Sequence, residues 1–170
     1  EETASIAIQA ALTGHLVFST LHTNDAPSAI TRLVNMGIPP FLVASSIQAV
    51  IAQRLVRMIC PQCKAEAPPE VPLLKASGLR DEQITSNTFY VGQGCEHCRD
   101  IGFRGRKGIY EIMVMNTRLR DLVFNVATTD EIREQAIRDG MHTLLMDGVR
   151  KILDGMTTVQ EVLSVAKKVD

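Results

Sequence analysis

The sequence has no tryptophan, and aromatic residues make up only 4% of its 170 residues. Few side chains are therefore available to stack on nucleic-acid bases. No apolar run approaches the length needed to span a bilayer. The formal net charge is −1, so no overall positive charge draws the chain to nucleic acid or anionic lipid. Hydrophobic residues still make up 45%, enough to bury a core in one domain or two small ones.

Two common nucleotide-binding motifs are also missing from the sequence. No Gly-x-x-x-x-Gly-Lys-Ser/Thr loop occurs. The glycines of Val91-Gly-Gln-Gly94 do not form a dinucleotide motif, because no helix led by the required glycine pattern follows them. By itself, the sequence therefore has no recognisable phosphate cradle.

The cysteines form two matched pairs, Cys60-Pro-Gln-Cys63 and Cys95-Glu-His-Cys98, separated by residues 64–94. Two Cys-x-x-Cys pairs supply four thiolates, the number that a structural Zn²⁺ binds in tetrahedral geometry. We therefore predict a zinc site in which the protein fills all four positions, a clamp rather than a catalytic centre. His97 is an alternative ligand, but four sulfurs suffice and a solvent-facing role is favoured.

Disulfides are the main alternative for these cysteines, with three possible connectivities, and free or redox-active thiols are a third. Disulfides persist mainly in secreted or periplasmic proteins. The chain begins Glu-Glu-Thr-Ala, without the basic region of a signal peptide, so zinc is the favoured interpretation.

The hydrophobic pattern predicts an α/β fold. Helices are expected over residues 2–13, from Pro27 to Met36, and over 41–52. Gly14 and Gly37 end the first two, and Thr23, Asn24 and Asp25 are N-cap candidates for the second. Two strands are expected in the same region. One spans residues 15–22 and is buried on both faces, and the other spans 53–59 and leads into the first cysteine pair.

After the first cysteine pair the sequence contains an irregular segment, then one strand, and then a helical region. Residues 64–94 contain several prolines and a polar stretch, which predict an irregular insertion with one short helix near 71–77 and no core of its own. A strand over 109–115 follows. Four short amphipathic helices complete the pattern, with capping boxes predicted at Thr128 and Thr158; they span 117–126, 128–140, 144–153 and 158–168.

Polar candidates for chemistry flank the first predicted strand. His15 and His22 stand at its two ends, and ligands bind beyond the carboxyl ends of strands in open α/β sheets. The alternative is that neighbouring backbone satisfies both rings. Arg104 and Arg106 lie between glycines, a setting that suits bidentate contact with an anion or an ordinary solvated turn.

Three blocks together resemble the type II secretion and type IV pilus assembly ATPases, the GspE/PilB-like traffic ATPases. The first runs from Glu2 through His15-Leu-Val-Phe-Ser-Thr-Leu-His22-Thr-Asn and is similar to the family's His box. The second is Ala52-Gln-Arg-Leu-Val-Arg57 before the first cysteine pair. The third joins Gly94-Cys95-x-x-Cys98 to Gly102-Phe-Arg-Gly-Arg106-x-Gly-Ile-Tyr-Glu111.

The resemblance implies a C-terminal piece that begins after the family's Walker B region. The implied segments are the C-terminal part of a RecA-like ATPase domain (1–59), a zinc-binding tetracysteine subdomain (60–98), a return strand to the ATPase core (99–115) and a helical subdomain (116–170). His15 and His22 match the His-box histidines and the cysteines match the zinc ligands, while Arg32, Arg104 and Arg106 resemble intersubunit or nucleotide-facing arginines.

The implied whole protein is a hexameric cytoplasmic ATPase that uses ATP and Mg²⁺. It would lie at the inner membrane through secretion or pilus-assembly platform proteins, with no nucleic-acid partner. Because the P-loop is missing, we expect the 170-residue chain alone to be inactive. Two alternatives from other classes are a zinc-ribbon module that binds nucleic acid through Arg99 to Lys107, and a structural oligomerisation module.

Overall fold

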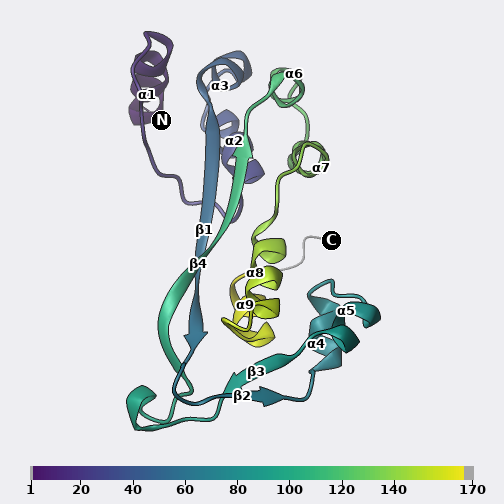
Figure 1. Ribbon diagram of the computed structural model, residues 1–170. Helices are drawn as coiled ribbons and strands as arrows, with labels where there is room; N and C mark the ends of the chain where they lie inside the picture. Colours follow the sequence, from purple (N-terminus) through teal and green to yellow (C-terminus); the bar gives the residue numbers. More distant parts are fainter. Residues whose placement is uncertain (1, 167–170) are drawn as a thin grey trace. The chain divides into compact units, whose positions relative to one another are not determined.

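The computed structural model describes residues 2–166 and divides into two compact units. The first unit contains residues 2–52 and 111–142, and the second contains 53–110 and 143–166. Strands β1 (Ala49–Ile59) and β4 (Phe103–Val114) pair with each other and contribute residues to both units (Figure 1). The strands are antiparallel, because the Met115 N–H donates to the Gln48 carbonyl and the Cys60 N–H donates to the Gly102 carbonyl, each at 2.9 Å.

Helices surround the core of the first unit. They are α1 (Glu2–Leu12), α2 (Ala26–Asn35), α3 (Pro40–Ser46), α6 (Thr117–Phe124) and α7 (Thr129–Arg138). The fully buried side chains of this unit include Ile30, Val43, Met113, Leu119 and Ile132. One side chain from each of α2, α3, β4, α6 and α7 thus closes a single apolar core.

The helix ends of the first unit confirm the sequence signals. The Asp25 carboxylate accepts from the Ser28 N–H at 2.8 Å and caps α2, and Pro27 stands in its first turn. Thr128 and Glu131 form the predicted capping box of α7. Gly37 has a φ of +89°, which a residue without Cβ adopts at no steric cost after a helix.

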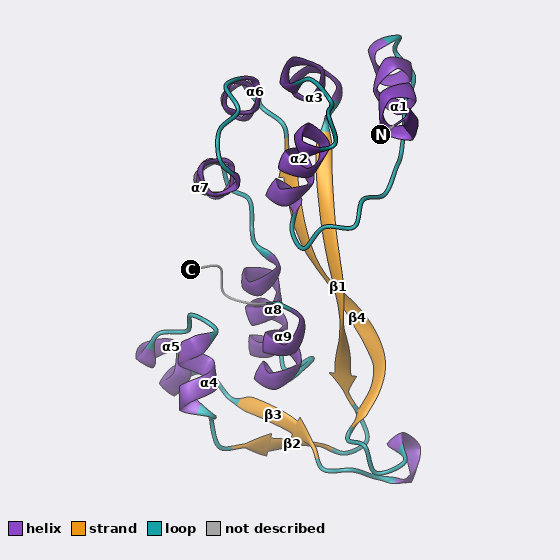
Figure 2. Ribbon diagram, turned by 180° about the vertical axis from the view of Figure 1, so that it is seen from behind, coloured by secondary structure: helices purple, strands orange, loops and turns teal. Residues whose placement is uncertain are grey.

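The second unit consists of a hairpin and short helices (Figure 2). Its elements, besides parts of β1 and β4, are β2 (Lys64–Ala67), α4 (Val71–Ala76), α5 (Asp81–Ser86), β3 (Phe89–Gly92), the 3₁₀ turn η1 (Glu96–Cys98), α8 (Leu144–Leu153) and α9 (Val159–Val165). The expectation of an irregular insertion over 64–94 is therefore wrong, although its one predicted helix is confirmed as α4. The segment forms regular structure because it buries apolar side chains, those of Leu74, Leu79, Ile84 and Phe89.

The connection between α8 and α9 holds the end of β1 in place. The Ile59 N–H donates to the Met156 carbonyl at 2.9 Å, and the Thr157 hydroxyl donates to the Arg57 carbonyl at 2.8 Å. Thr158 caps α9 as predicted. Glu161, the other residue of the predicted capping box, instead uses its carboxylate to accept from Arg57 at 2.5 Å. The end predicted for this helix at residue 168 lies outside the described residues.

Two sequence predictions about the first unit are wrong. Residues 15–22 do not form a buried strand: Leu16 is 82% exposed and Phe18 is 87% exposed. Within 2–166, no strand pairs with this segment, and an extended segment without a neighbour gains no ladder of hydrogen bonds. The helix predicted over 41–52 ends at Ser46, because the residues from Ala49 onward pair with β4 as the start of β1.

In the part of the chain that is described, no helix is both long enough and apolar enough to cross a bilayer. The division into segments 1–59, 60–98, 99–115 and 116–170 stays a prediction from the sequence.

Candidate metal centre and histidine segment

The four cysteine sulfurs converge on one point in the second unit. The side chains of Cys60, Cys63, Cys95 and Cys98 each offer a sulfur, and these atoms all lie within 4.8 Å of one another. The Sγ–Sγ distances are 3.9 Å for Cys60 and Cys95, 3.8 Å for Cys63 and Cys98, and 3.7 Å for Cys95 and Cys98. A tetrahedral site with metal–sulfur bonds of about 2.3 Å has an edge of about 3.8 Å. The cluster therefore fits one four-coordinate metal ion.

A β-hairpin brings the two cysteine pairs together. Strand β2 follows the first pair, β3 precedes the second, and the antiparallel register places Lys64 opposite Gly92. The Gln93 N–H donates to the Cys63 carbonyl at 3.0 Å, which continues the pairing up to the cluster. The two ends of the segment 64–94 are thus paired by a short ladder, and the four sulfurs meet beside the Lys64–Gly92 end of that ladder.

Backbone N–H groups point at the sulfurs and favour negative charge there. The Sγ of Cys98 accepts from the N–H groups of Cys95 and Gly102, each at 3.2 Å. Burial raises the pKa of this thiol, but these donors and the neighbouring thiols outweigh burial and lower it to about 7. Burial and the thiol groups around Cys63 raise its pKa to about 12, against the N–H of Gly94. A metal ion would bind all four sulfurs as thiolates.

Two glycines allow the backbone segments beside the cluster to touch. A Cβ built on Gly92 would lie 1.9 Å from the Gly102 carbonyl oxygen, and one on Gly102 would lie 2.4 Å from the Gly92 oxygen. Gly102 also has a φ of +77°. Since the carbonyl of Gly102 accepts from Cys60 and its N–H donates to Cys98, this close approach positions both cysteine pairs.

The predicted histidines lie on the exposed segment of the first unit. The Nδ1 of His15 is 3.0 Å from the Thr13 hydroxyl, just after α1. His22 is also exposed, three residues before the Asp25 cap of α2. The structure therefore leaves both rings accessible, and their assignment as catalytic residues stays a prediction.

The predicted arginines are divided between the two units. Arg32 lies exposed on α2, in the same unit as the histidines. Arg104 and Arg106 lie exposed at the start of β4, in the same unit as the cysteines, and the Arg104 guanidinium donates to the His97 carbonyl. A nucleotide-facing or intersubunit role for these three residues stays a prediction.

Sequence reasoning missed a polar network beside the histidine segment. Glu111 is 3% exposed, and its carboxylate accepts from the Ala26 N–H at 2.7 Å. The guanidinium of Arg133 lies 3.0 Å from the carboxylate of Asp25. Asp25 was one of three N-cap candidates in the sequence. However, 85 residues separate Ala26 from Glu111 and 108 separate Asp25 from Arg133, so no local signal links them.

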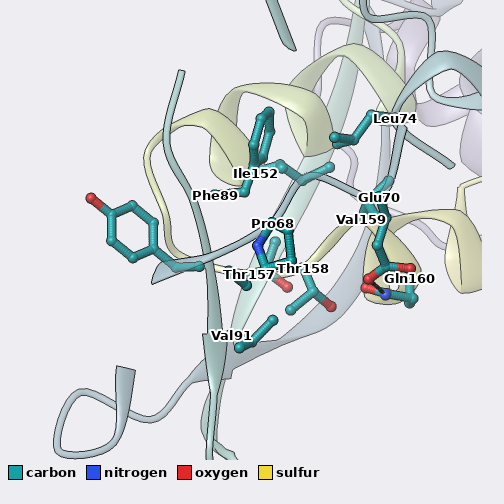
Figure 3. Close-up of a pocket in the computed structure, with 12 residues that line it drawn as sticks. Pro68, Glu70, Leu74, Phe89, Val91, Ile152, Thr157, Thr158, Val159 and Gln160 are labelled. Carbon is teal, nitrogen blue, oxygen red and sulfur yellow. Dashed lines mark hydrogen bonds between the residues drawn. The ribbon is translucent and has the colours of Figure 1, made fainter. Parts of the chain in front are cut away.

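The second unit also contains a small hollow between the hairpin and the α8–α9 connection (Figure 3). Phe89 and Ile152 form its apolar wall, and Gln160 donates to Glu70 at its rim. Its volume of about 20 Å³ gives room for about one water molecule. This hollow is part of the packing of the unit rather than a ligand site.

The fold matches part of a molecular motor. The solved structure described as the pilus retraction motor PilT with bound ADP aligns with a TM-score of 0.64 and 22% sequence identity. The alignment covers 98% of this chain and 37% of that chain. The chain therefore has the fold of about a third of that structure.

The chain belongs to the family of type II/IV secretion system proteins, which it matches over residues 1–164. It is 51% identical over 164 residues to the type IV pilus assembly ATPase PilB of Myxococcus xanthus, covering 95% of this chain and 29% of that protein. It is 47% identical over 167 residues to the type II secretion system protein E of Pseudomonas aeruginosa, covering 98% and 33%. The chain thus spans about a third of the length of these relatives.

Proposed function

We propose that the chain is the C-terminal part of an ATPase that powers type IV pilus assembly or type II secretion by hydrolysing ATP. The observation that carries this proposal is the similarity to PilB and to protein E over nearly the whole chain, at 51% and 47% identity. In the proposed whole protein, a hexamer binds ATP and Mg²⁺ mainly through residues outside this chain. It works at the cytoplasmic face of the inner membrane, held by platform proteins.

Within this protein we assign the chain's polar groups to positioning and electrostatics, which dominate phosphoryl transfer. His22 donates to the terminal phosphate, and His15 supports the same segment. The exposure of Leu16 and Phe18 supports this assignment, because a segment with outward apolar side chains is suited to packing against the nucleotide-bearing part. Arg32, Arg104 and Arg106 are exposed and can reach an anion or a neighbouring subunit.

We propose Zn²⁺ as the ion at the four cysteines. Four sulfurs at tetrahedral spacing and N–H donors to Cys98 support this choice, since zinc binds four thiolates without an open position. The ion would clamp the two cysteine pairs and take no part in hydrolysis. The clamp serves the motor, and we propose no nucleic-acid partner for the exposed arginines around it.

The test is steady-state ATP turnover by the full-length protein and two of its variants. His22→Ala is expected to lower kcat by about 100-fold, the loss typical of a group that assists the reacting phosphate. His142→Ala is the matched control, because His142 is an exposed histidine preceding α8. Equal turnover by His22→Ala and His142→Ala would exclude the role of His22.

A further inference from the structure

The backbone directly after the histidine segment is held by a buried carboxylate from a distant strand. Ala26 is fully buried, and its N–H donates to Oε1 of Glu111 at 2.7 Å. Glu111 lies on β4 and is itself 3% exposed. Burial of a carboxylate carries a large desolvation cost, and hydrogen bonds to the carboxylate offset that cost.

A second carboxylate fixes the preceding residue. One oxygen of Asp25 accepts from the Ser28 N–H at 2.8 Å, and the other accepts from Arg133 at 3.0 Å. The side chains of Asp25 and Arg133 are only 15% and 13% exposed. Their attraction is therefore less screened by water than that of a surface pair.

Further contacts make this an anchored junction. The hydroxyl of Thr129, at the start of α7, donates to the Thr31 hydroxyl on α2 at 3.1 Å. The Thr23 hydroxyl donates to the Asp25 carbonyl at 3.2 Å. Residues 23–26 and the first turns of α2 are thus tied to β4 and to α7 (Figure 2), all within the first unit.

The two carboxylates satisfy different N–H groups at the start of α2, Asp25 that of Ser28 and Glu111 that of Ala26. Asp25 already caps α2, the usual way to satisfy the first N–H groups of a helix. Glu111 adds a second carboxylate at the same helix end, where the positive end of the helix dipole favours it. His22 is four residues from Ala26, so it lies no farther than about 14 Å from this anchor.

We propose that Glu111 and the Asp25–Arg133 pair are positioning residues for His22. They hold the junction at the start of α2, so that the preceding segment presents the His22 ring in one place. This inference rests on the proposed function, in which His22 acts on the terminal phosphate. The proposal concerns geometry alone: neither Glu111 nor Arg133 touches the nucleotide.

The test is a set of double-mutant cycles in the full-length protein, measured as kcat and KM for ATP. Glu111→Met removes the acceptor at similar length and is expected to lower kcat about tenfold with KM changed by less than about twofold. Glu111→Gln keeps an oxygen acceptor and should restore most of kcat. Arg133→Met should act as Glu111→Met does, whereas Arg138→Met, at an exposed pair on the same helix, should have no effect.

The cycle with His22 separates positioning from a purely structural role. If Glu111 acts through His22, then Glu111→Met lowers kcat no further once His22 is already alanine. The same tenfold loss in both backgrounds overturns the proposal. If Glu111→Met does not fold, as judged by thermal melting, the Arg133→Met cycle decides in the same way. Full activity of His22→Ala alone instead contradicts the role of His22 in the proposed function, a result distinct from an additive cycle.

Discussion

The guanidinium of Arg133 lies 3.0 Å from a carboxylate oxygen of Asp25, 108 residues earlier in the chain. Arg133 also pairs with Asp130 one turn away on its own helix. Because both members of the long-range pair are largely buried, the contact joins α2 to α7 more firmly than a surface ion pair would.

The first prediction concerns the energy of that contact. Arg133→Met leaves the Asp25 carboxylate without its cationic partner and should lower the free energy of unfolding by about 2 kcal/mol, as for hydrogen bonds to charged groups. Denaturant unfolding of the 170-residue chain measures this loss. Arg138→Met is the control, because Arg138 pairs with Glu134 at the surface. Equal stability of the two variants would contradict the prediction.

The second prediction is a pH dependence. Burial raises the pKa of Asp25, but hydrogen bonds from Ser28 and Arg133 outweigh burial and hold the pKa below its ordinary value. The stabilising contribution of this carboxylate is therefore complete above its unfolded pKa of about 3.9 and is lost as the pH falls through the lower folded value.

Asp25→Asn isolates this charge, because asparagine also caps helices well. The difference in unfolding free energy between the wild type and Asp25→Asn should be constant from pH 7 to about pH 5 and should shrink toward pH 2. Urea unfolding over this range measures the difference. A gap that stays constant at low pH would mean that the Asp25 charge adds no stability.

The third prediction uses two glycines with the same backbone conformation. Gly102 and Gly105 both have a φ of +77°. A Cβ on Gly102 meets the Gly92 carbonyl oxygen at 2.4 Å, whereas one on Gly105 meets no atom within 4 Å. Both alanine variants carry the strain of the left-handed region, about 1 kcal/mol. Gly102→Ala alone should also displace the N–H group that donates to Cys98 and lower the bound metal content.

The fourth prediction concerns the metal. The purified chain should contain about one zinc ion, and Cys98→Ser should lower that content because zinc prefers four thiolates here. Removal of the ion by a chelator should lower the melting temperature and expose four reactive thiols. Elemental analysis with thiol counting makes the measurement. A metal-free chain with its cysteines already joined as disulfides would refute the zinc assignment.

The fifth prediction comes from Val126, a β-branched residue with a φ of +56° at the end of α6. This conformation is costly for valine, and its side chain is 63% exposed, so little burial is lost on removing it. Val126→Gly should therefore raise the unfolding free energy by about 1 kcal/mol. Val114 is matched in exposure at 64% but lies in β4, where glycine should destabilise by about 0.5–1 kcal/mol.

The sequence predicted the elements whose signals are local. Helix α7 has its capping box at Thr128 and Glu131, and α2 has its cap at Asp25 with Pro27 after it, so both were found close to their observed bounds. The close approach of the cysteine pairs followed from their number and spacing. Such features depend on residues a few positions apart, which a sequence displays directly.

Features that depend on distant partners were missed or misplaced. The apolar run at Leu16 and Phe18 has the pattern of a buried strand, yet a strand also requires a neighbour to pair with. Residues from Ala49 to Ala52 have a pattern that suits a helix or a strand, and pairing with β4 decided between them. The contacts of Glu111 and Arg133 could not be predicted from the sequence either, because their partners lie 85 and 108 residues away.

The central claim is that this chain is part of an ATP-hydrolysing secretion or pilus-assembly motor. Steady-state ATP turnover by the purified full-length protein with Mg²⁺ tests it most directly, with the 170-residue chain measured alongside. The account predicts turnover by the full-length protein and none by the chain alone, which contains no P-loop motif. No turnover by a folded full-length protein, or turnover by the isolated chain, would contradict it.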